Sequence, residues 1–450
     1  LERQLHRPAA DNPRGAVAVK RAPPRPATSP AAPDVGNLQF FNGFGGFDAD
    51  AREYVVQHRQ GQRLPAPWIN VIANPHFGIH CSAEGGGYTW SGNSRERQVT
   101  GWSNDAVTDR PSEVFYVYDQ DTGELASPAV DPLGSRPGAF CTRHGFGYTV
   151  HEGSECGLAM ELIQTVDTRD PVKCVKLRLT NGRNSLRKLR ITFYAEPVLG
   201  QRRAMTSHFV TSEYDTQADA LFLRNRWNPD FGETVVFADL QGRQTAWSGN
   251  RRAVLGTQGA IRSPHGLLVS AALPNETGGG LDPCIALQRD LELAAHETAE
   301  IVLTFGAAES ADLARQLVGN YRERDFGDTL AGQRNQWQEL AEKIQVKTPD
   351  PAFDLMMNGW LPYQTISCRM WARAGFYQAS GAYGFRDQLQ DSMTLAHVRP
   401  DLARQHILTA ASRQFVEGDV QHWWLPETGA GVRTRISDDT VWLAYCTAYY

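Results

Sequence analysis

The stretch VKLRLTNGRNSLRKLRITF (175–193) shows the residue pattern that decides the fold of most of the chain. Apolar residues alternate with polar or charged ones in VKLRL and again in LRITF, on either side of NGRN (181–184). Alternation with a period of two is typical of a strand with one buried face, and Asn-Gly is a strong turn signal. The stretch therefore predicts two strands joined by a turn.

A pattern of short apolar runs between Gly, Asn, Asp and Pro extends from about residue 37 to residue 306. Evenly spaced short strands over such a length predict a large antiparallel β-sandwich. Residues 1–36 differ, because they are rich in Pro, Ala and Arg and lack apolar periodicity. A segment of this kind buries too little apolar surface to offset its ordering entropy, so we expect a disordered linker or tail there.

The apolar spacing becomes helical after residue 306, which predicts a helical linker over 307–349 and an all-helical region over 350–450. The last helix is apolar and leaves a face uncovered, so we expect the helical region to be incomplete. The expected helices cover residues 310–321, 329–346, 353–370 with an interruption at Pro362, 388–398, 401–415, and a last segment from Ser437.

The composition narrows the range of functions. The 450 residues include 45 Lys and Arg against 50 Asp and Glu, which argues against nucleic acid as the main partner. The seven cysteines are scattered without a CxxC pair, so we expect a reducing, cytoplasmic location. No run of apolar residues predicts a membrane span, and no P-loop, GxGxxG, HExxH or GxSxG motif supports nucleotide, zinc-protease or serine-hydrolase chemistry.

The loop GAYGFRDQLQD (381–391) concentrates glycines, aromatic residues, an arginine and two carboxylates. If a helix begins here, Asp387 and Asp391 project from one face and line one wall of a cleft. A structural interpretation is equally good, with Asp387 as N-cap, Gln390 completing a capping box, and Asp391 as a first-turn acid. The loop by itself does not choose between the two interpretations.

Three further segments combine aromatic and charged residues with glycine or helix-end positions. GGGYTWSGNSRER (85–97) fits either a loop that presents polar groups to a polyhydroxylated ligand or an ordered hairpin with a salt bridge. In RMWAR (369–373), Arg369 either caps a helix end or clamps an oxyanion. HWWLPETGAGVRTRISDD (422–439) places two tryptophans and Glu427 on a loop before a helix that Ser437 would N-cap.

The chain resembles the family-94 glycoside phosphorylases in five segments that follow one another in the family's order. Within the family it is most similar to the phosphorylase-like region of cyclic β-1,2-glucan synthases and to the β-1,2-oligoglucan phosphorylases. The resemblance implies a sandwich of the supersandwich type, a helical linker and the first part of an (α/α)6 barrel. The segments are FFNGFGGF (40–47), APWINVIANPHFG (66–78), GGGYTWSGNSRERQVTGWSND (85–105), RMWARAGFYQASGAYGFRDQLQD (369–391) and WWLPETGAGVRTRISDD (423–439).

The resemblance implies inverting phosphorolysis of a β-1,2-linked glucan, or the reverse synthesis. Inorganic phosphate would be the co-substrate and attack the anomeric carbon while a carboxylic acid protonates the departing oxygen, so no metal or cofactor is expected. By position, Asp387 would hold hydroxyls of the sugar at subsite −1, and Arg373 would contact sugar and phosphate. Arg386, Asp391 and Trp424 are the further substrate-binding residues that we expect.

The family's general acid lies in a D-W-N-D type motif that these residues do not contain, so we expect it beyond Tyr450 and do not assign the role to Asp438 or Asp439. In a cyclic glucan synthase, a membrane glycosyltransferase would lie upstream and the protein would sit at the cytoplasmic side of the inner membrane. Two other functions stay open: a glucan-binding module without turnover, and an inverting hydrolase on the same scaffold. The oligomeric state is open as well.

Overall fold

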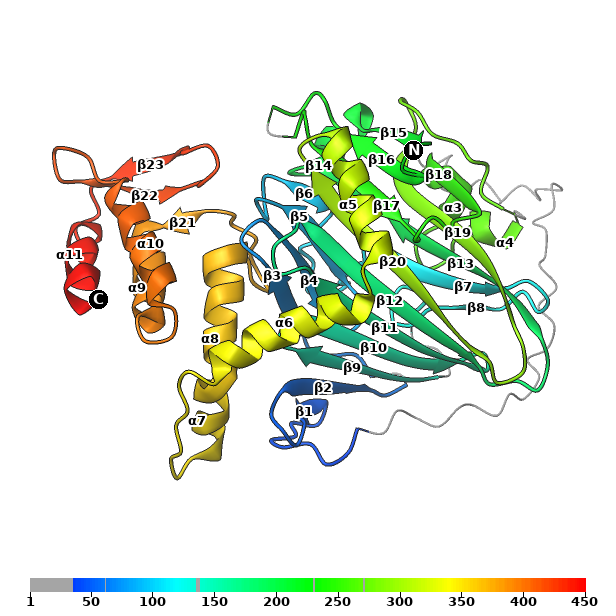
Figure 1. Cartoon of the computed structure of the whole chain (residues 1–450), viewed down its shortest axis with the longest axis horizontal. Coiled ribbons are helices and arrows are strands. Elements are labelled where there is room, and N and C mark those ends of the chain that lie inside the picture. Colours follow the sequence, from blue (N-terminus) through cyan, green and yellow to red (C-terminus); the bar gives the residue numbers. More distant parts are fainter. Residues whose placement is uncertain (1–34, 61, 135–137, 230, 270–271) are drawn as a thin grey trace, which may run out of the picture.

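The computed structural model describes residues 35–450 except 61, 135–137, 230 and 270–271, and consists of a strand-rich body followed by helices. Figure 1 shows the C-terminal helices to one side of the sheets, with α6 (Phe326–Ala341) running from the sheets toward them. The predicted order of sandwich and helical region is confirmed, whereas the (α/α)6 barrel stays a prediction. The tail expected at 1–36 falls, up to residue 34, outside the described residues.

The largest sheet has ten strands in the described part of the chain, and every neighbouring pair is antiparallel. In spatial order the strands are β1 (Gly45–Phe47), β2 (Glu53–His58), β9 (Ala139–Gly145), β10 (Tyr148–Glu155), β11 (Leu158–Val166), β12 (Val172–Asn181), β20 (Thr298–Ala308), β17 (Val235–Asp239), β16 (Ala220–Arg224) and β15 (Thr211–Asp215).

Two sheets of five strands each pack against the large sheet. The first contains β18 (Ala246–Asn250), β19 (Pro283–Leu293), β13 (Arg187–Ala195), β7 (Glu113–Asp119) and β8 (Leu125–Ala126). The second contains β14 (Pro197–Gly200), β6 (Gln98–Thr100), β5 (Gly87–Ser91), β4 (Phe77–Ser82) and β3 (Ile69–Ala73). Short helices α2 (Arg203–Thr206), η1 (Ser207–Phe209), α3 (Arg251–Leu255) and α4 (His265–Val269) lie in the connections.

The alternation seen in the sequence is an alternation of burial, because its apolar residues all lie in one core between the sheets. However, β12 pairs with β11 and β20, whereas β13 pairs with β19 and β7. The turn at 181–184 therefore carries the chain from one sheet to the other and does not close a hairpin. The apolar residues concerned are Val175, Leu177, Leu179, Leu189, Ile191 and Phe193.

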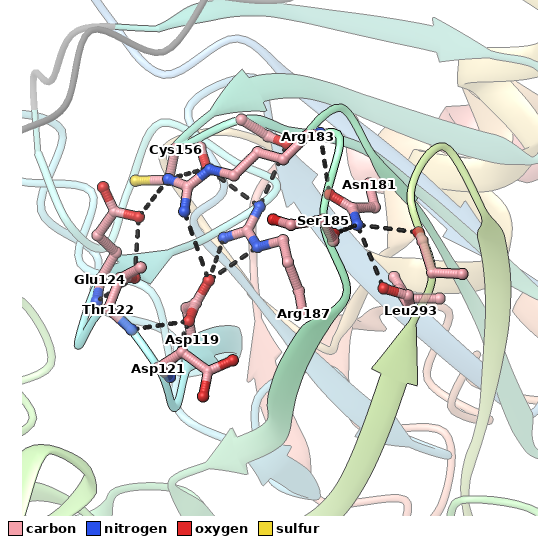
Figure 2. Close-up of polar contacts among 12 residues, drawn as sticks. Asp119, Asp121, Thr122, Glu124, Cys156, Asn181, Arg183, Ser185, Arg187 and Leu293 are labelled. Atoms are coloured by element: carbon pink, nitrogen blue, oxygen red, sulfur yellow. Dashed lines mark hydrogen bonds and ion pairs between the residues drawn. The ribbon is translucent and has the colours of Figure 1, made fainter.

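Polar side chains hold this crossing in place, as Figure 2 shows. Nδ2 of the buried Asn181 donates to the carbonyl oxygens of Ser185, Leu293 and Ala294 at 2.8, 3.2 and 2.9 Å. Because these acceptors belong to the crossing and to the end of β19, one amide fixes where the chain enters the second sheet.

Two arginines extend the network to neighbouring turns (Figure 2). Arg187 Nη2 lies 2.6 Å from Asp119 Oδ2, with side chains only 3% and 2% exposed. Arg183 donates to Glu124 at 2.6 Å and to the carbonyl of Cys156 at 3.1 Å. The turn after β7 and the turn between β10 and β11 are thereby tied to the crossing.

The helical region begins where the sequence pattern predicts. α5 (Ala311–Glu323) starts after Ser310, whose Oγ accepts from the Leu313 amide, and it is followed by α6. The chain from Pro351 to Ala372 is one continuous helix of alternating α and π turns, so the interruption expected at Pro362 is wrong. Pro362 lies inside this helix, in the α-helical segment α8 (Leu361–Gln364) between two π-helical segments, and the residues on both sides of α8 keep helical backbone angles.

The remaining elements of the helical region are three helices and a small sheet. A loop was expected around the tryptophan pair, and the structure has a hairpin there. The segments of the long helix are α7 (Pro351–Leu355), η2 (Met356–Trp360), α8 and η3 (Thr365–Ala372); the other elements are α9 (Phe385–Leu395), α10 (Pro400–Ala411), α11 (Asp439–Tyr449), β21 (Tyr383–Gly384), β22 (Val420–Trp424) and β23 (Gly431–Thr434).

An aromatic cluster joins the helices to the large sheet. Phe146 follows β9, and its ring centroid lies 4.7 Å from that of Trp360 and 5.2 Å from that of Tyr363. Trp337 of α6 meets Tyr363 edge to face at 4.7 Å. These rings form one buried core, so the helical region is docked on the sandwich by apolar packing. No helix among the described residues is long and apolar enough to cross a membrane.

We expect Asp119→Ala to lower the free energy of unfolding of the sandwich by about 3–5 kcal/mol, because it leaves the Arg187 guanidinium buried without its counter-charge. The control is Glu292→Ala, which removes a carboxylate 3.9 Å from Lys188 in an exposed pair and should cost at most about 0.5 kcal/mol. Chemical denaturation measures both values. Equal costs would contradict a structural role for the buried pair.

A second prediction concerns acid stability. Burial lowers the pKa of His80 and His151 to about 3 and that of His144 to about 4, so the folded protein keeps all three neutral. The unfolded chain binds these protons near pH 6.5, so the free energy of unfolding should fall as the pH drops below about 6.5. His151→Gln should reduce this slope and the exposed His296→Gln should not. A free energy of unfolding that is constant between about pH 7 and pH 5 would contradict the account.

Candidate functional site

The long helix ends at Arg373, which adopts a left-handed conformation with φ 50° and ψ 43°. Its guanidinium is buried and makes four hydrogen bonds. Nε donates to the carbonyl of Gly381 (2.9 Å), Nη1 to that of Trp371 (3.0 Å), and Nη2 to that of Gly92 (3.2 Å) and to Oε1 of Glu427 (2.9 Å). Moving any of these partners would leave the buried guanidinium without one of its hydrogen-bond acceptors. The cation therefore fixes the relative positions of the segments that contribute them.

Asn93 brings the sandwich into the same cluster. It lies fully buried in the turn between β5 and β6, and its Nδ2 donates to the Gly381 carbonyl at 2.9 Å and to Oε2 of Glu427 at 2.7 Å. Its Oδ1 accepts from the backbone amides of Arg95 and Glu96, which fixes the orientation of the amide group. We call Asn93, Arg373, Gly381 and Glu427 the junction cluster.

Gly381 is the position in the cluster where the backbone demands glycine. Its φ is +63°, a left-handed value, and a Cβ there would overlap the side chain of Asn93. The glycine-rich loop therefore serves close packing between the domains as well as the turn itself.

Helix α9 follows this loop and carries the two predicted carboxylates. Its N-cap is Gly384, whose amide donates to Oε1 of Gln388 at 2.6 Å, so the expected capping box of Asp387 and Gln390 is wrong. Asp387 lies instead inside the first turn, exposed, with its carboxylate beside Gly384. The N-cap lies at Gly384 and not at Asp387, because Tyr383 and Gly384 pair with β22 and the helix starts directly after this pairing.

Asp391 lies one turn further along the same face. Its Oδ2 is 2.8 Å from Nε of Arg369, so Arg369 neither caps the helix end with that group nor stands as a free anion clamp. Burial raises the pKa of Asp391, the neighbouring Asp387 raises it further, and Arg369 opposes both effects. The charge of Asp387 therefore acts on Asp391, in keeping with the spacing of four residues along the helix.

Two other predicted residues have different surroundings. Arg386 is exposed, with Nη1 2.7 Å from Oδ2 of Asp438 and its guanidinium carbon 5.5 Å from the ring centre of Trp442. Trp424 is 0% exposed and packs in a core with Phe385. A ring without an exposed face cannot stack on a sugar, so the role expected of Trp424 is corrected to core packing. Its neighbour Trp423 is 37% exposed.

The two acidic residues at the start of α11 also have side-chain partners. Asp438 is the N-cap residue in place of the expected Ser437, and its carboxylate pairs with Arg386. Oδ2 of the buried Asp439 lies 2.7 Å from Nδ1 of His422 on β22. Both contacts tie α11 to neighbouring elements, which is a structural use of these side chains.

The structure thus separates Arg373 from the two predicted carboxylates. Arg373 is buried in the junction cluster, whereas Asp387 and Asp391 lie on the accessible face of α9. No local sequence pattern predicts that Asn93 and Glu427 meet, although both lie in segments that combine aromatic and polar residues. Among the described residues, no group of three or more His, Cys, Asp and Glu is arranged to hold a metal ion.

Comparison with known proteins finds two family matches and several similar proteins. The profile "Glycosyl hydrolase 94, supersandwich domain" matches residues 52–324, and "Glycosyl hydrolase 94 superfamily, catalytic domain" matches residues 336–449. The chain is 45% identical over 417 residues to cyclic beta-(1,2)-glucan synthase NdvB of Rhizobium meliloti, covering 93% of this chain and 15% of that protein. It is 28% identical over 413 residues to solabiose phosphorylase of Paenibacillus borealis, covering 89% of this chain and 51% of that protein.

Among solved structures, a bacterial glucoamylase complexed with acarbose matches with a TM-score of 0.55 at 10% identity, covering 92% of this chain and 58% of that one. At this identity the likeness concerns the fold alone. The chain spans about half of the phosphorylase and about a seventh of the glucan synthase.

We expect Asn93→Ala to loosen the junction cluster by about 1–3 kcal/mol, because the Gly381 carbonyl and Glu427 each lose a buried donor. The amides of Ser380 and Gly381, which both donate to the Arg373 carbonyl, should exchange with solvent about tenfold faster or more. Ser94→Ala is the matched control, since its buried hydroxyl lies 3.5 Å from that carbonyl and contributes little. If both variants exchange alike, Asn93 does not hold the loop.

Proposed function

Because the chain belongs to glycosyl hydrolase family 94, we propose that it supplies the sandwich domain and part of the catalytic domain of an enzyme that acts on a β-1,2-linked glucan. The reaction that we propose is inverting phosphorolysis, or the reverse synthesis from glucose 1-phosphate. The similarity to NdvB supports the glucan as substrate class, and the similarity to solabiose phosphorylase supports phosphate as the acceptor of the glycosyl group.

The observation that carries this proposal is the placement of Asp387. Its carboxylate is exposed on the first turn of α9, while the loop before it is held by the buried side chains of Asn93 and Arg373. An acceptor group fixed on a rigid element can receive hydrogen bonds from two sugar hydroxyls and orient the anomeric carbon for in-line attack. Asp391, one turn further along α9, is paired with Arg369, so this pair adds no net charge beside Asp387.

For Arg373 we propose a positioning role in place of the phosphate contact expected from the sequence. Four of its hydrogen bonds already go to protein acceptors, and its ring contact with Tyr383, at 4.9 Å, fills one face. Binding phosphate would require the buried guanidinium to give up the Glu427 carboxylate, 2.9 Å away. Neither Asp438 nor Asp439 is proposed as the general acid, because each is already paired.

We further propose a cytoplasmic location for the chain. None of the seven cysteines, all of which the structure describes, forms a disulfide, and burial raises the pKa of Cys81, Cys141 and Cys368 to about 12, so these three are unreactive. Free thiols are usual for proteins of a reducing compartment.

The test uses the complete protein with β-1,2-glucooligosaccharides and inorganic phosphate. We expect phosphate-dependent release of glucose 1-phosphate with inverted configuration. Asp387→Asn should lower kcat/KM by about 100-fold or more, because the sugar loses its fixed acceptor. The control Asp312→Asn removes an exposed acid of α5 and should leave kcat/KM unchanged.

Other outcomes separate the remaining functions. Release of free glucose that is indifferent to phosphate would show a hydrolase and contradict phosphorolysis. Saturable glucan binding without any product in either direction would show a binding module and contradict an enzymatic role.

A further inference from the structure

The loop between β6 and β7 (101–112) is held to the sandwich near both of its ends. Near the start, the ring of Trp102 stacks on that of Tyr88, with centroids 6.0 Å apart and planes that differ by 28°. Near the end, Nη2 of Arg110 lies 3.0 Å from Oε1 of Glu196. The middle of the loop is exposed, and its position depends on one further contact with the sandwich.

That contact is made by the carboxyl group of Asp109, which sits on the turn between β4 and β5. Its Oδ2 accepts a hydrogen bond from the hydroxyl of Ser82, whose oxygen in turn accepts from the amide of Gly86 at 2.8 Å. A Cβ at Gly86 would overlap the carboxyl group. Asp109 has a φ of 39°, a left-handed value that is uncommon for a residue with a side chain. The loop therefore closes on this turn through a specific fit.

Two further carboxylates border the same turn. The amide of Asp131 donates to the carbonyl of Glu84 at 2.8 Å, and the two side chains are 0% and 8% exposed. The cations that the structure describes beside them are already paired with these acids. Arg63 lies 3.2 Å from Glu84 and 3.7 Å from Asp131, and Arg262 lies 3.3 Å from Asp131. Ionised Asp109 thus faces two negative groups across a neutral hydrogen bond.

These surroundings favour the protonated carboxyl group. Burial raises the pKa of Asp109 to about 6, and its two acidic neighbours raise it as well, whereas the Ser82 hydroxyl and the nearby arginine oppose the shift. In an open loop the group returns to its ordinary value of 3.8. Docking is therefore strongest at pH values below 3.8 and weakens as the pH rises through about 6. Asp105, the other acid of the loop, has a pKa lowered by the Thr108 hydroxyl and stays ionised over this range.

We propose that Asp109 is a pH-sensitive latch. The loop docks on the turn between β4 and β5 when this carboxyl group is protonated, and it opens more often when the group is ionised. Trp102, at the start of the loop, packs against a core that contains Ala372 and Ala374 of the helical region. The latch thereby adjusts how tightly the edge of the sandwich packs on the helices, and it does not depend on the proposed function.

Hydrogen exchange on the complete protein tests the latch. The reporters are the amide of Gly86, which donates to Ser82, and the amide of Asp109, which donates to the Asp105 carbonyl at 2.9 Å. We expect their protection factors to be about tenfold lower at about pH 7.5 than at about pH 5. The amides of β12 are the internal reference. Their protection should change in the opposite direction, because the buried histidines destabilise the whole domain in acid.

Three variants separate the charge from the shape of the group. Asp109→Asn keeps the shape without the charge, so it should remove the pH dependence and give the higher protection at both pH values. Ser82→Ala removes the hydrogen-bond donor but leaves the titrating group, so it should lower protection at both pH values and keep the dependence. The control Asp312→Asn removes an exposed acid of α5 and should behave as the wild type.

Each of three results would overturn the proposal. Equal protection of the wild-type loop at both pH values would show that docking is not linked to a proton. Unchanged pH dependence in Asp109→Asn would assign the proton to another group. A change in the loop that runs parallel to that of β12 would show unfolding of the whole domain and no separate movement of the loop.

Discussion

The buried guanidinium of Arg373 is the constraint on which the arrangement of the site depends. Removing an arginine from water is costly unless its charge and its N–H groups are met, and here the acceptors come from separate parts of the chain. Gly92 belongs to the sandwich, Glu427 to the hairpin of β22 and β23, and Gly381 to the loop before α9. None of these segments can shift without removing a hydrogen-bond acceptor from the Arg373 guanidinium.

The sandwich therefore acts as a support for the helical region. Besides the junction cluster, the hydroxyl of Tyr363 donates to Oδ1 of Asn70 at 2.8 Å, and the hydroxyl of Ser367 donates to the carbonyl of Val71. Both partners lie on β3, so the long helix is fixed along its length as well as at its end. The π turns in this helix widen it where it meets β3, and π turns are frequent near functional sites.

The sequence was informative wherever one short pattern determines a local structure. The alternation around residues 175–193 identified strands and their buried faces, and the spacing of Asp387 and Asp391 placed both on one face of α9. It could not show that the two strands belong to different sheets, because pairing depends on distant partners. The contact between Asn93 and Glu427 joins residues 334 positions apart, which no local pattern encodes. Trp424 was misjudged because a tryptophan pair in a hairpin sends its two rings to opposite faces, and only the packing of α9 and α10 decides which face is buried.

The central claim is that the sandwich and the helical region meet in one cooperative polar cluster. A double-mutant cycle of Asn93→Ala and Glu427→Ala, read as the free energy of unfolding, tests it most directly. We predict a coupling energy of about 1 kcal/mol or more, because each residue loses part of its stabilising effect once the other is gone. Effects that add within about 0.3 kcal/mol would contradict the claim, since they would mean that the two side chains stabilise their own segments independently.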